Sequence, residues 1–412
     1  PPPRARLLPR VSLKDVNTLE PFAHTEDINY EDIKRDSVGL LVYNVAVAQD
    51  IVPGVYCWDG NHWLKIASTE EGLGGGIDNP DPTITNIDDP AALTLPNSYI
   101  LQPGKSLVIS VIKGYAVWKQ LLNKDEASLA GEVTVDLLWQ TKQNMIKGVS
   151  LYEGDKGKDT KIRIDTNELD GNALIALKIN GVVKWSWHIW VTYYEPMEGG
   201  TVSNNGYEMM DRNLGALYTT ASSLLSKGML YQWGRKNPFP GAGSLTSDNV
   251  EREIYDINNN VVTLSFESAP NADNRELSIS NPMVFYTNNG DWTSPTTVGP
   301  FWNGTGGSKG LTDPCPSGWK VPIDASVWAG LPTDFEYTDE SGLNWNKNGY
   351  EGGFYPSAGY REATTGSLKI SERAGYYWTA SLMPGTSNAY RLYFREWDFN
   401  SNNVSPRAQG NS

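Results

Sequence analysis

The stretch Lys184-Trp-Ser-Trp-His-Ile-Trp-Val-Thr192 carries the strongest structural signal of the chain. Its residues alternate between an apolar set and a more polar set. The apolar set is Trp185, Trp187, Ile189 and Val191, and the second set is Lys184, Ser186, His188 and Trp190. Successive side chains of a strand point to opposite faces, so this period of two predicts a half-buried β-strand with His188 on the outward face.

Similar signals surround this stretch. Residues 133–139 and 161–165 alternate, residues 107–112 and 173–179 are short apolar runs, and Asn180-Gly181 is a turn signal. No amphipathic helical pattern separates them. Closely spaced strands of this kind predict an immunoglobulin-like β-sandwich, which we assign to residues 46–196.

The N-terminal segment carries weaker signals. Residues 38–47 are a strand-like run, and Asp59-Gly60 between two apolar arms predicts a hairpin over residues 55–66. Residues 72–90 are rich in Gly, Pro, Asp and Asn, which is typical of a surface loop or linker. Because the chain starts with Pro1-Pro-Pro-Arg-Ala-Arg6, residues 1–45 are expected to be a leader or anchor-proximal segment.

Composition restricts the function. The chain has 412 residues, 15 Trp and 21 Tyr, and 48 acidic against 34 basic side chains, for a net charge of −14. A negative chain is repelled by nucleic acid and by anionic lipid, so neither is expected as a partner. No stretch has the length of a membrane span, and no signal peptide begins the chain. The aromatic, Gly- and Pro-rich composition favours a mainly β, exported protein.

A break at Glu195-Pro-Met-Glu-Gly-Gly200 separates a C-terminal region of different texture, residues 200–412. Two short helices are predicted there, from Leu217 to Lys227 and from Asp324, as N-cap, to Leu331. The remainder is irregular, with single aromatic residues in polar loops. This pattern predicts an irregular α+β domain held by scattered buried aromatics.

The C-terminal region contains a series of motifs. They are Asp211-Arg-Asn-Leu-Gly-Ala216, Tyr231-Gln-Trp-Gly-Arg-Lys236, Asp313-Pro-Cys-Pro-Ser-Gly-Trp-Lys-Val-Pro322, Ser357-Ala-Gly-Tyr-Arg361, Gly375-Tyr-Tyr-Trp-Thr-Ala-Ser381 and Ala389-Tyr-Arg-Leu-Tyr-Phe394. In this order they resemble the Fibrobacter succinogenes major paralogous domain of Bacteroidetes surface lipoproteins. Asn97-Ser-Tyr-Ile100, Leu138-Trp-Gln140, Gly171-Asn-Ala173 and the 185–192 strand resemble the module that precedes this domain in fimbrillin-like proteins.

This resemblance implies a C-type-lectin-like fold for residues 200–412 and a fimbrial, pilus-tip or accessory adhesin at the cell surface. The implied partners are other pilus subunits, or a surface glycan or protein, with the membrane reached only through a removed lipid anchor. Strand exchange between subunits is a further hypothesis. A glycan-binding accessory lipoprotein of a polysaccharide-uptake system is the alternative. Family members usually end in Ser-Val-Arg-Cys, whereas this chain ends in Gly410-Asn-Ser412, which leaves Cys315 without the partner that the resemblance implies.

We expect no enzymatic activity. The histidines are His24, His62 and His188, and no Gly-x-Ser-x-Gly elbow accompanies them. The resemblance extends to formylglycine-generating enzymes, but the cysteine chemistry of that group is not reproduced around Cys315. Cys57 and Cys315 either pair or remain two lone thiols.

No cofactor or metal is expected. The loop from Asp398 to Asn403 places oxygens at alternate positions, but it lacks the turn glycine and the acidic last ligand of a calcium loop. Sugars stack on aromatic rings, so the candidate ligand-binding residues are the aromatics of polar, Gly-rich loops. These are Trp292, Trp302, Trp345, Tyr360 and Trp397, whereas Trp233, Trp319, Trp328 and Trp378 lie within the motifs and are expected in the core.

Overall fold

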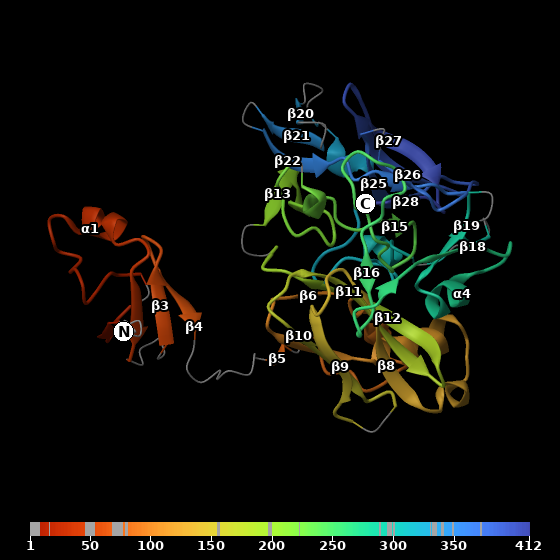
Figure 1. Ribbon diagram of the computed structural model, residues 1–412, viewed down its shortest axis with the longest axis horizontal. Coiled ribbons are helices and arrows are strands. Elements are labelled where there is room, and N and C mark those ends of the chain that lie inside the picture. Colours follow the sequence, from red (N-terminus) through yellow and green to blue (C-terminus); the bar gives the residue numbers. More distant parts are fainter. Residues whose placement is uncertain are drawn as a thin grey trace. The chain divides into compact units, whose positions relative to one another are not determined.

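The computed structural model describes residues 9–15, 17–45, 54–67, 77–78, 81–154, 157–196, 200–221, 223–287, 290–294, 299, 301–329, 331, 336–338, 342–347, 350–370 and 373–412 (Figure 1). The chain forms two compact units, residues 1–76 and 77–412. The division therefore falls after Gly76, and not at the sequence boundaries expected after residues 45 and 196. Both units are built mainly from β-sheet, as predicted.

The N-terminal unit holds one four-stranded sheet. Its strands, in spatial order, are β1 (Arg10–Val11), β2 (Leu41–Asn44), β3 (Gly54–Trp58) and β4 (Trp63–Ala67), and helix α1 (Tyr30–Asp36) precedes β2. The predicted hairpin is confirmed as β3–β4, and the Asp59 carboxylate closes its turn by accepting from the N–H groups of Asn61 and His62.

A small aromatic core stabilises this unit. Trp58 and Trp63 are buried with ring centroids 5.3 Å apart, and Leu13 and Leu19 pack in the same cluster. The indole N–H of Trp63 donates to the Thr18 carbonyl at 2.8 Å. Residues expected to be a leader thus contribute β1 and β2 to the sheet and form helix α1 before β2. Their buried apolar side chains pack in one cluster with the two tryptophans.

The second unit contains two large sheets. One has the order β5 (Ile77–Asp78), β7 (Ser106–Ser110), β10 (Lys161–Thr166), β9 (Ile146–Tyr152), and the other β17 (Val261–Val262), β16 (Ile254–Tyr255), β8 (Val133–Gln140), β11 (Gly171–Ile179), β12 (Val182–Val191), β6 (Ser98–Leu101). Ile109 and Ile164 of the first sheet share a buried core with Ile175 and Trp187 of the second. The predicted turn at Asn180-Gly181 joins β11 to β12 with positive φ at both residues. These sheets enclose a common core, while an immunoglobulin-like topology stays a prediction.

Short helices close this part of the unit. They are α2 (Pro90–Thr94), α3 (Ile112–Ala116) continuing into the π-helical turn η1 (Val117–Leu121), and the 3₁₀ turn η2 (Glu126–Leu129). Asp89 caps α2 by accepting from the N–H of Ala91 at 2.9 Å. The linker predicted over residues 72–90 lies partly outside the described residues, and its end leads directly into this capped helix.

Strand β12 is buried on both faces, so the prediction of an outward His188 is wrong. Trp185 and Trp187 point into the core shared by the two sheets. On the opposite face, Ser186 bonds Asn237 at 2.8 Å, and His188 lies 3.5 Å from the hydroxyl of Tyr231. Residues beyond 200 cover this face, and a strand covered on both faces has no solvent side.

The C-terminal region also extends the second sheet. Tyr255 of β16 pairs with Gln140 of β8. Trp139 and Leu174 share a buried cluster with Trp233 and Trp378. The expected boundary at residues 196–200 therefore divides the sequence without dividing the compact unit, because the two regions bury their apolar faces against each other.

Small sheets and turns build the rest of the unit (Figure 1). The sheets are β13 (Thr201–Asn204) with β14 (Tyr207–Met210); β15 (Tyr231–Gln232), β28 (Gly410–Asn411), β23 (Tyr360–Arg361), β24 (Leu368–Lys369); β18 (Ser265–Ser268) with β19 (Val284–Thr287); β20 (Glu336–Thr338), β21 (Gly342–Lys347), β22 (Tyr350–Pro356); and β25 (Gly375–Leu382), β26 (Asn388–Arg395), β27 (Asp398–Pro406). The helical elements are η3 (Leu224–Ser226), α4 (Arg275–Ser280), η4 (Thr305–Gly307) and η5 (Ala325–Trp328).

The two predicted helices are shorter than expected. Among the described residues of the range 217–227, helix is confined to η3, where Ser223 caps it by accepting from the Leu225 N–H. The β-branched pair Thr219-Thr220 disfavours helix in the preceding part. The Asp324 cap is confirmed, since its carboxylate accepts from the Ser326 N–H at 2.8 Å, but η5 ends at Trp328. In the described residues, no helix combines the length and the apolar character needed to cross a bilayer.

Candidate functional site

A pocket of about 400 Å³ opens beside the β13–β14 hairpin of the second unit. Its walls are residues 207–212 of the hairpin and the loop that follows, residues 318–322, and the segment 353–355 of β22. Val327 and Trp328 of η5 complete the lining. Small-molecule and side-chain pockets in proteins commonly have volumes of several hundred Å³, so this one is of ligand size.

The hairpin wall is set by a two-residue turn. Asn205 and Gly206 both have positive φ, at 48° and 78°, as a tight hairpin turn with the twist of its strands requires. The Asn205 amide donates to the Ser326 carbonyl at 2.7 Å. The Asn204 amide donates to the hydroxyl of Tyr355 at 2.8 Å. These bonds tie the hairpin to η5 and to β22, and Figure 1 shows β13 next to β22.

A buried carboxylate shapes the opposite wall. Asp313 is completely buried and accepts from the N–H groups of Cys315 and Val321, each at 2.8 Å. The ammonium group of Lys309 donates to the same carboxylate at 2.6 Å and neutralises it. A charge-assisted arrangement of this kind holds a loop in one conformation. It places Trp319, which is half-buried, at the rim of the pocket.

The floor is aromatic, and most of its polar atoms are already paired. The indole of Trp378 donates to the Tyr231 carbonyl at 2.9 Å, and that of Trp302 donates to the Arg235 carbonyl at 3.2 Å. The hydroxyl of Tyr377 donates to the Pro356 carbonyl at 2.6 Å. Burial raises the pKa of Tyr377 well above its ordinary value, so the phenol stays neutral. The floor therefore presents an uncharged apolar surface.

Two polar atoms of the lining have no partner within the described residues. They are the indole nitrogen of Trp328 and the hydroxyl of Ser412. Buried polar groups are normally hydrogen-bonded, but both of these atoms are enclosed by protein atoms and neither is exposed to the pocket.

The charges at the pocket balance. Arg212 donates to both oxygens of Asp211, at 2.7 and 3.1 Å, and its guanidinium stacks 3.8 Å from the ring of Tyr194. Glu208 and Lys320 add one further charge of each sign. Two acids and two bases give these side chains no net charge, which favours a neutral ligand.

The lining offers no activated nucleophile. Burial, followed by the nearby Asp313, raises the pKa of the Cys315 thiol well above its ordinary value, so it remains a thiol. His188 lies elsewhere in the core, where burial lowers its pKa to about 3. Cys57 and Cys315 are both free thiols. Among the described residues, no three His, Cys, Asp or Glu side chains are close enough to hold a metal ion.

The five aromatics predicted to bind ligand do not form one site. Trp292 and Trp345 are 1% exposed, so no ring face is open for stacking, and the expectation for these two is corrected to core packing. Trp302 is 2% exposed and contributes to the pocket floor. Tyr360 is half-buried against Tyr376, with centroids 4.9 Å apart, and Trp397 is 73% exposed at the β26–β27 turn. A ligand role for Tyr360 and Trp397 stays a prediction.

Sequence reasoning missed the residues that line the pocket. Trp328 was expected in the core and is 2% exposed, but it also reaches the lining. Trp319 was expected in the core and lies at the rim. Tyr207 and Met210 come from a hairpin that the sequence analysis did not single out, although Asn205-Gly206 is a usable turn signal. The stretch from Asp398 to Asn403 is strand β27 and not a coordinating loop.

The comparisons with known proteins concern mainly the N-terminal unit. Residues 4–85 match the model of one protein family, which is described as a phage tail like trimerisation region. A search of curated proteins found no match. This segment of the chain is therefore similar to a phage tail like trimerisation region.

Proposed function

We propose that this chain is a non-enzymatic cell-surface adhesion protein that acts as a trimer. In this proposal the N-terminal unit joins three copies, and the second unit binds the ligand through the pocket beside β14. The match of residues 4–85 to a trimerisation region carries the proposal, because it covers nearly all of the compact unit formed by residues 1–76. Three linked copies of a weak binding site gain avidity, which suits attachment to a surface.

The apolar surface of the N-terminal unit supports the trimer. Among the residues of this small unit that the structure describes, six large apolar side chains are exposed, namely Phe22, Ile28, Ile33, Val38, Leu41 and Val45. Helix α1 has no buried residue in the monomer. Exposed apolar groups concentrated on a small unit are typical of surfaces that another chain covers.

The experiment is the native mass of the full chain by light scattering after size-exclusion chromatography. We expect a mass near three times 45.5 kDa. The double substitution Val38→Glu with Leu41→Glu places two charges on the apolar surface and is expected to yield monomers. Val261→Glu is the matched control, because Val38 is 58% and Val261 is 60% exposed, and Val261 lies in the other unit. A monomeric wild-type chain at micromolar concentration would overturn the trimer.

Adhesion is tested by binding of the trimer and of the monomeric variant to a glycan array and to a panel of surface proteins, each with and without calcium. The proposal expects selective binding that is weaker by about a hundredfold in the monomer, since avidity is lost. Equal binding by trimer and monomer would contradict the role of trimerisation. Absence of selective binding in both panels would contradict adhesion and favour the role of a structural fimbrial subunit.

A glycan-binding accessory protein of a polysaccharide-uptake system is the second candidate, and Trp397 is the observation that favours it. This indole is 73% exposed beside the Asn-rich strand β27. Exposed aromatic rings flanked by amides suit the apolar face and polar edge of a sugar. Loss of glycan-array signal in Trp397→Ala, with no change in native mass, would support this role.

A further inference from the structure

Strand β14 is the edge of a two-stranded sheet, and its outer side is unpaired. Asn204 pairs with Tyr207 next to the two-residue turn, and Val202 pairs with Met209 two positions further along the strands. Two positions beyond that pair, the Asp211 N–H donates to the Gly200 carbonyl at 3.1 Å. In an antiparallel pair, every second residue exchanges hydrogen bonds with its partner. The backbone groups of Glu208 and Met210 therefore point away from β13, and within the described residues they have no backbone partner.

This free edge borders the pocket. Glu208 and Met210 both contribute to its lining, and Glu208 is exposed while Met210 is half-buried. Tyr207, at the start of β14, is 47% exposed and also lines the pocket. Unpaired N–H and C=O groups along an accessible strand are a template for another extended chain. When another extended chain pairs with β14, every second side chain of that chain faces the pocket.

The lining favours a peptide over a sugar. A sugar ring carries hydroxyl groups around its edge, and each of them needs a partner when it is enclosed. The phenol of Tyr377 and the indole of Trp378 are bonded within the protein, and the unpaired Trp328 nitrogen is enclosed, so the floor offers a sugar few hydrogen-bond partners. An extended peptide needs few side-chain partners, because the edge of β14 supplies backbone bonds and an apolar side chain fills the aromatic space.

We propose that β14 and the adjoining pocket bind an extended, uncharged peptide segment of a partner protein, which adds as a strand and inserts one large apolar side chain. This assignment rests on the proposed binding role of the second unit and does not depend on trimerisation. The balanced charges of Asp211, Arg212, Glu208 and Lys320 place no net charge requirement on the inserted residue.

The probe is a displayed library of linear peptides of about seven residues, which is a typical length for strand addition, selected on the full chain. Enriched sequences are then synthesised and their affinities measured by fluorescence anisotropy. We expect enrichment of peptides with one Leu, Met, Phe or Trp at a constant position and no net charge. Failure to enrich any peptide overturns the proposal.

Two matched pairs of variants test the site. Glu208→Pro removes an N–H group that the protein itself does not use, together with a side chain that accepts from the Thr201 hydroxyl at 3.1 Å. Glu208→Ala removes the same side chain but keeps the N–H, so we expect Glu208→Pro to bind at least about tenfold more weakly than Glu208→Ala while the fold is kept. Tyr207→Ala removes a pocket contact, whereas Tyr218→Ala removes an equally exposed ring outside the lining, at 48% against 47%.

We expect Tyr207→Ala to weaken binding at least about fivefold and Tyr218→Ala to leave it unchanged. Equal affinity of the selected peptides for wild type, Glu208→Pro and Tyr207→Ala overturns the assignment. A glycan-array signal that falls in Tyr207→Ala would make the pocket a sugar site, which overturns the peptide ligand and leaves adhesion standing. The native mass is measured separately, so a failed trimer and a failed peptide site are distinguishable.

Discussion

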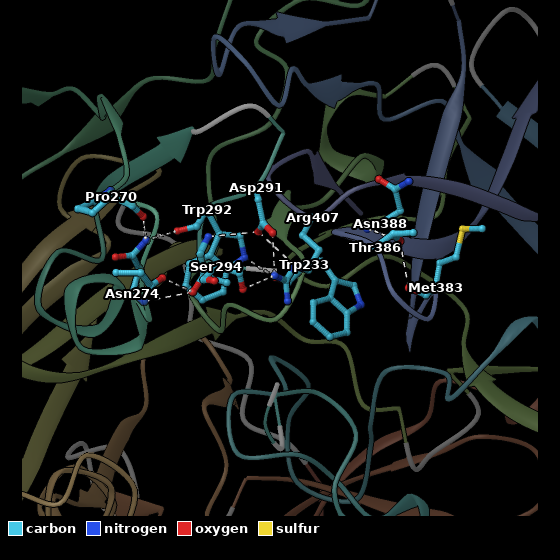
Figure 2. A network of polar contacts seen from close by, with 12 residues as sticks. Trp233, Pro270, Asn274, Asp291, Trp292, Ser294, Met383, Thr386, Asn388 and Arg407 are labelled. Carbon is cyan, nitrogen blue, oxygen red and sulfur yellow. Dashed lines mark hydrogen bonds and ion pairs between the residues drawn. The ribbon is translucent and has the colours of Figure 1, made fainter. Parts of the chain in front are cut away.

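The carboxylate of Asp291 accepts two hydrogen bonds from the guanidinium of Arg407, at 3.1 and 2.7 Å, across 116 residues of sequence (Figure 2). Both side chains are buried, and Arg407 also donates to the Ser294 carbonyl at 2.9 Å. The Arg407 carbonyl accepts from the Trp233 N–H at 3.1 Å. This pair joins the last strands of the chain to the loop after β19.

Arg407→Met is expected to destabilise the second unit by about 3–5 kcal/mol, because it leaves the Asp291 carboxylate buried without a counter-charge. Replacing both residues, as Arg407→Met with Asp291→Leu, should recover a large part of this loss. Lys124→Met is the control, since Lys124 and Glu276 form a pair 2.8 Å apart that is 36% and 46% exposed. Urea unfolding measures the free energy of unfolding of all three variants. A similar loss in Lys124→Met would show that burial of the Asp291–Arg407 pair does not account for the effect.

His188 makes the second unit sensitive to acid. The Asn172 amide donates to the Gly215 carbonyl at 2.9 Å, which directs its oxygen to His188 Nε2 at 2.8 Å. Burial lowers the pKa of His188 to about 3, whereas an unfolded histidine titrates near 6.5. Below pH 6.5 the folded state therefore binds fewer protons than the unfolded state. The contribution of neutral His188 to the free energy of unfolding is complete above pH 6.5 and is lost as pH falls toward 3.

Between pH 7 and 4.5, wild type should lose about 2–3 kcal/mol more than His188→Gln through this group. Hydrogen exchange of peptides from residues 171–191 reports the second unit separately. His62→Gln is the control, because His62 is 55% exposed in its side chain. A pH profile of His188→Gln that parallels wild type would show that another group controls acid stability.

Two glycines with the same φ angle allow the energetic cost of steric crowding to be measured separately from the cost of backbone strain. Gly359 and Gly385 both have a φ of +72°. A Cβ at Gly359 would lie 2.2 Å from the Lys369 carbonyl oxygen, whereas one at Gly385 meets nothing within 4 Å. Gly385→Ala should cost about 1–2 kcal/mol from the left-handed backbone alone.

Gly359→Ala should cost at least about 2 kcal/mol more, because a backbone carbonyl must move. Thermal unfolding compares the two variants directly. Equal melting temperatures would mean that the backbone of β24 at Lys369 shifts without cost.

Asn97 connects the two sequence regions of the second unit. Its amide donates to the carbonyls of Leu311 and Asp313, each at 2.9 Å. Asn97→Ala leaves both buried acceptors unpaired and should cost about 2–3 kcal/mol. Asn402→Ala, on the exposed part of β27, is the control and should change unfolding by less than about 0.5 kcal/mol. An unfolding midpoint for Asn97→Ala that matches the control would contradict this connecting role.

Local patterns in the sequence were sufficient for the elements that depend on neighbours in the chain. The β3–β4 hairpin follows from Asp59-Gly60, the turn after β11 from the residue types of Asn180-Gly181, and the η5 cap from Asp324. The period of two at residues 184–192 correctly predicted β12. These features arise from backbone preferences and from hydrogen bonds that span two to four residues.

Only the tertiary structure decided what covers each element. Alternation in β12 could not reveal that its second face is buried, since Asn237 and Tyr231, which contact it, follow some 50 residues later. The pocket was equally hidden, because Tyr207, Trp319 and Tyr355 come from segments far apart in the chain. The sequence by itself determined which residues form strands and turns, while long-range packing decided which aromatic rings became core and which remained open to a ligand.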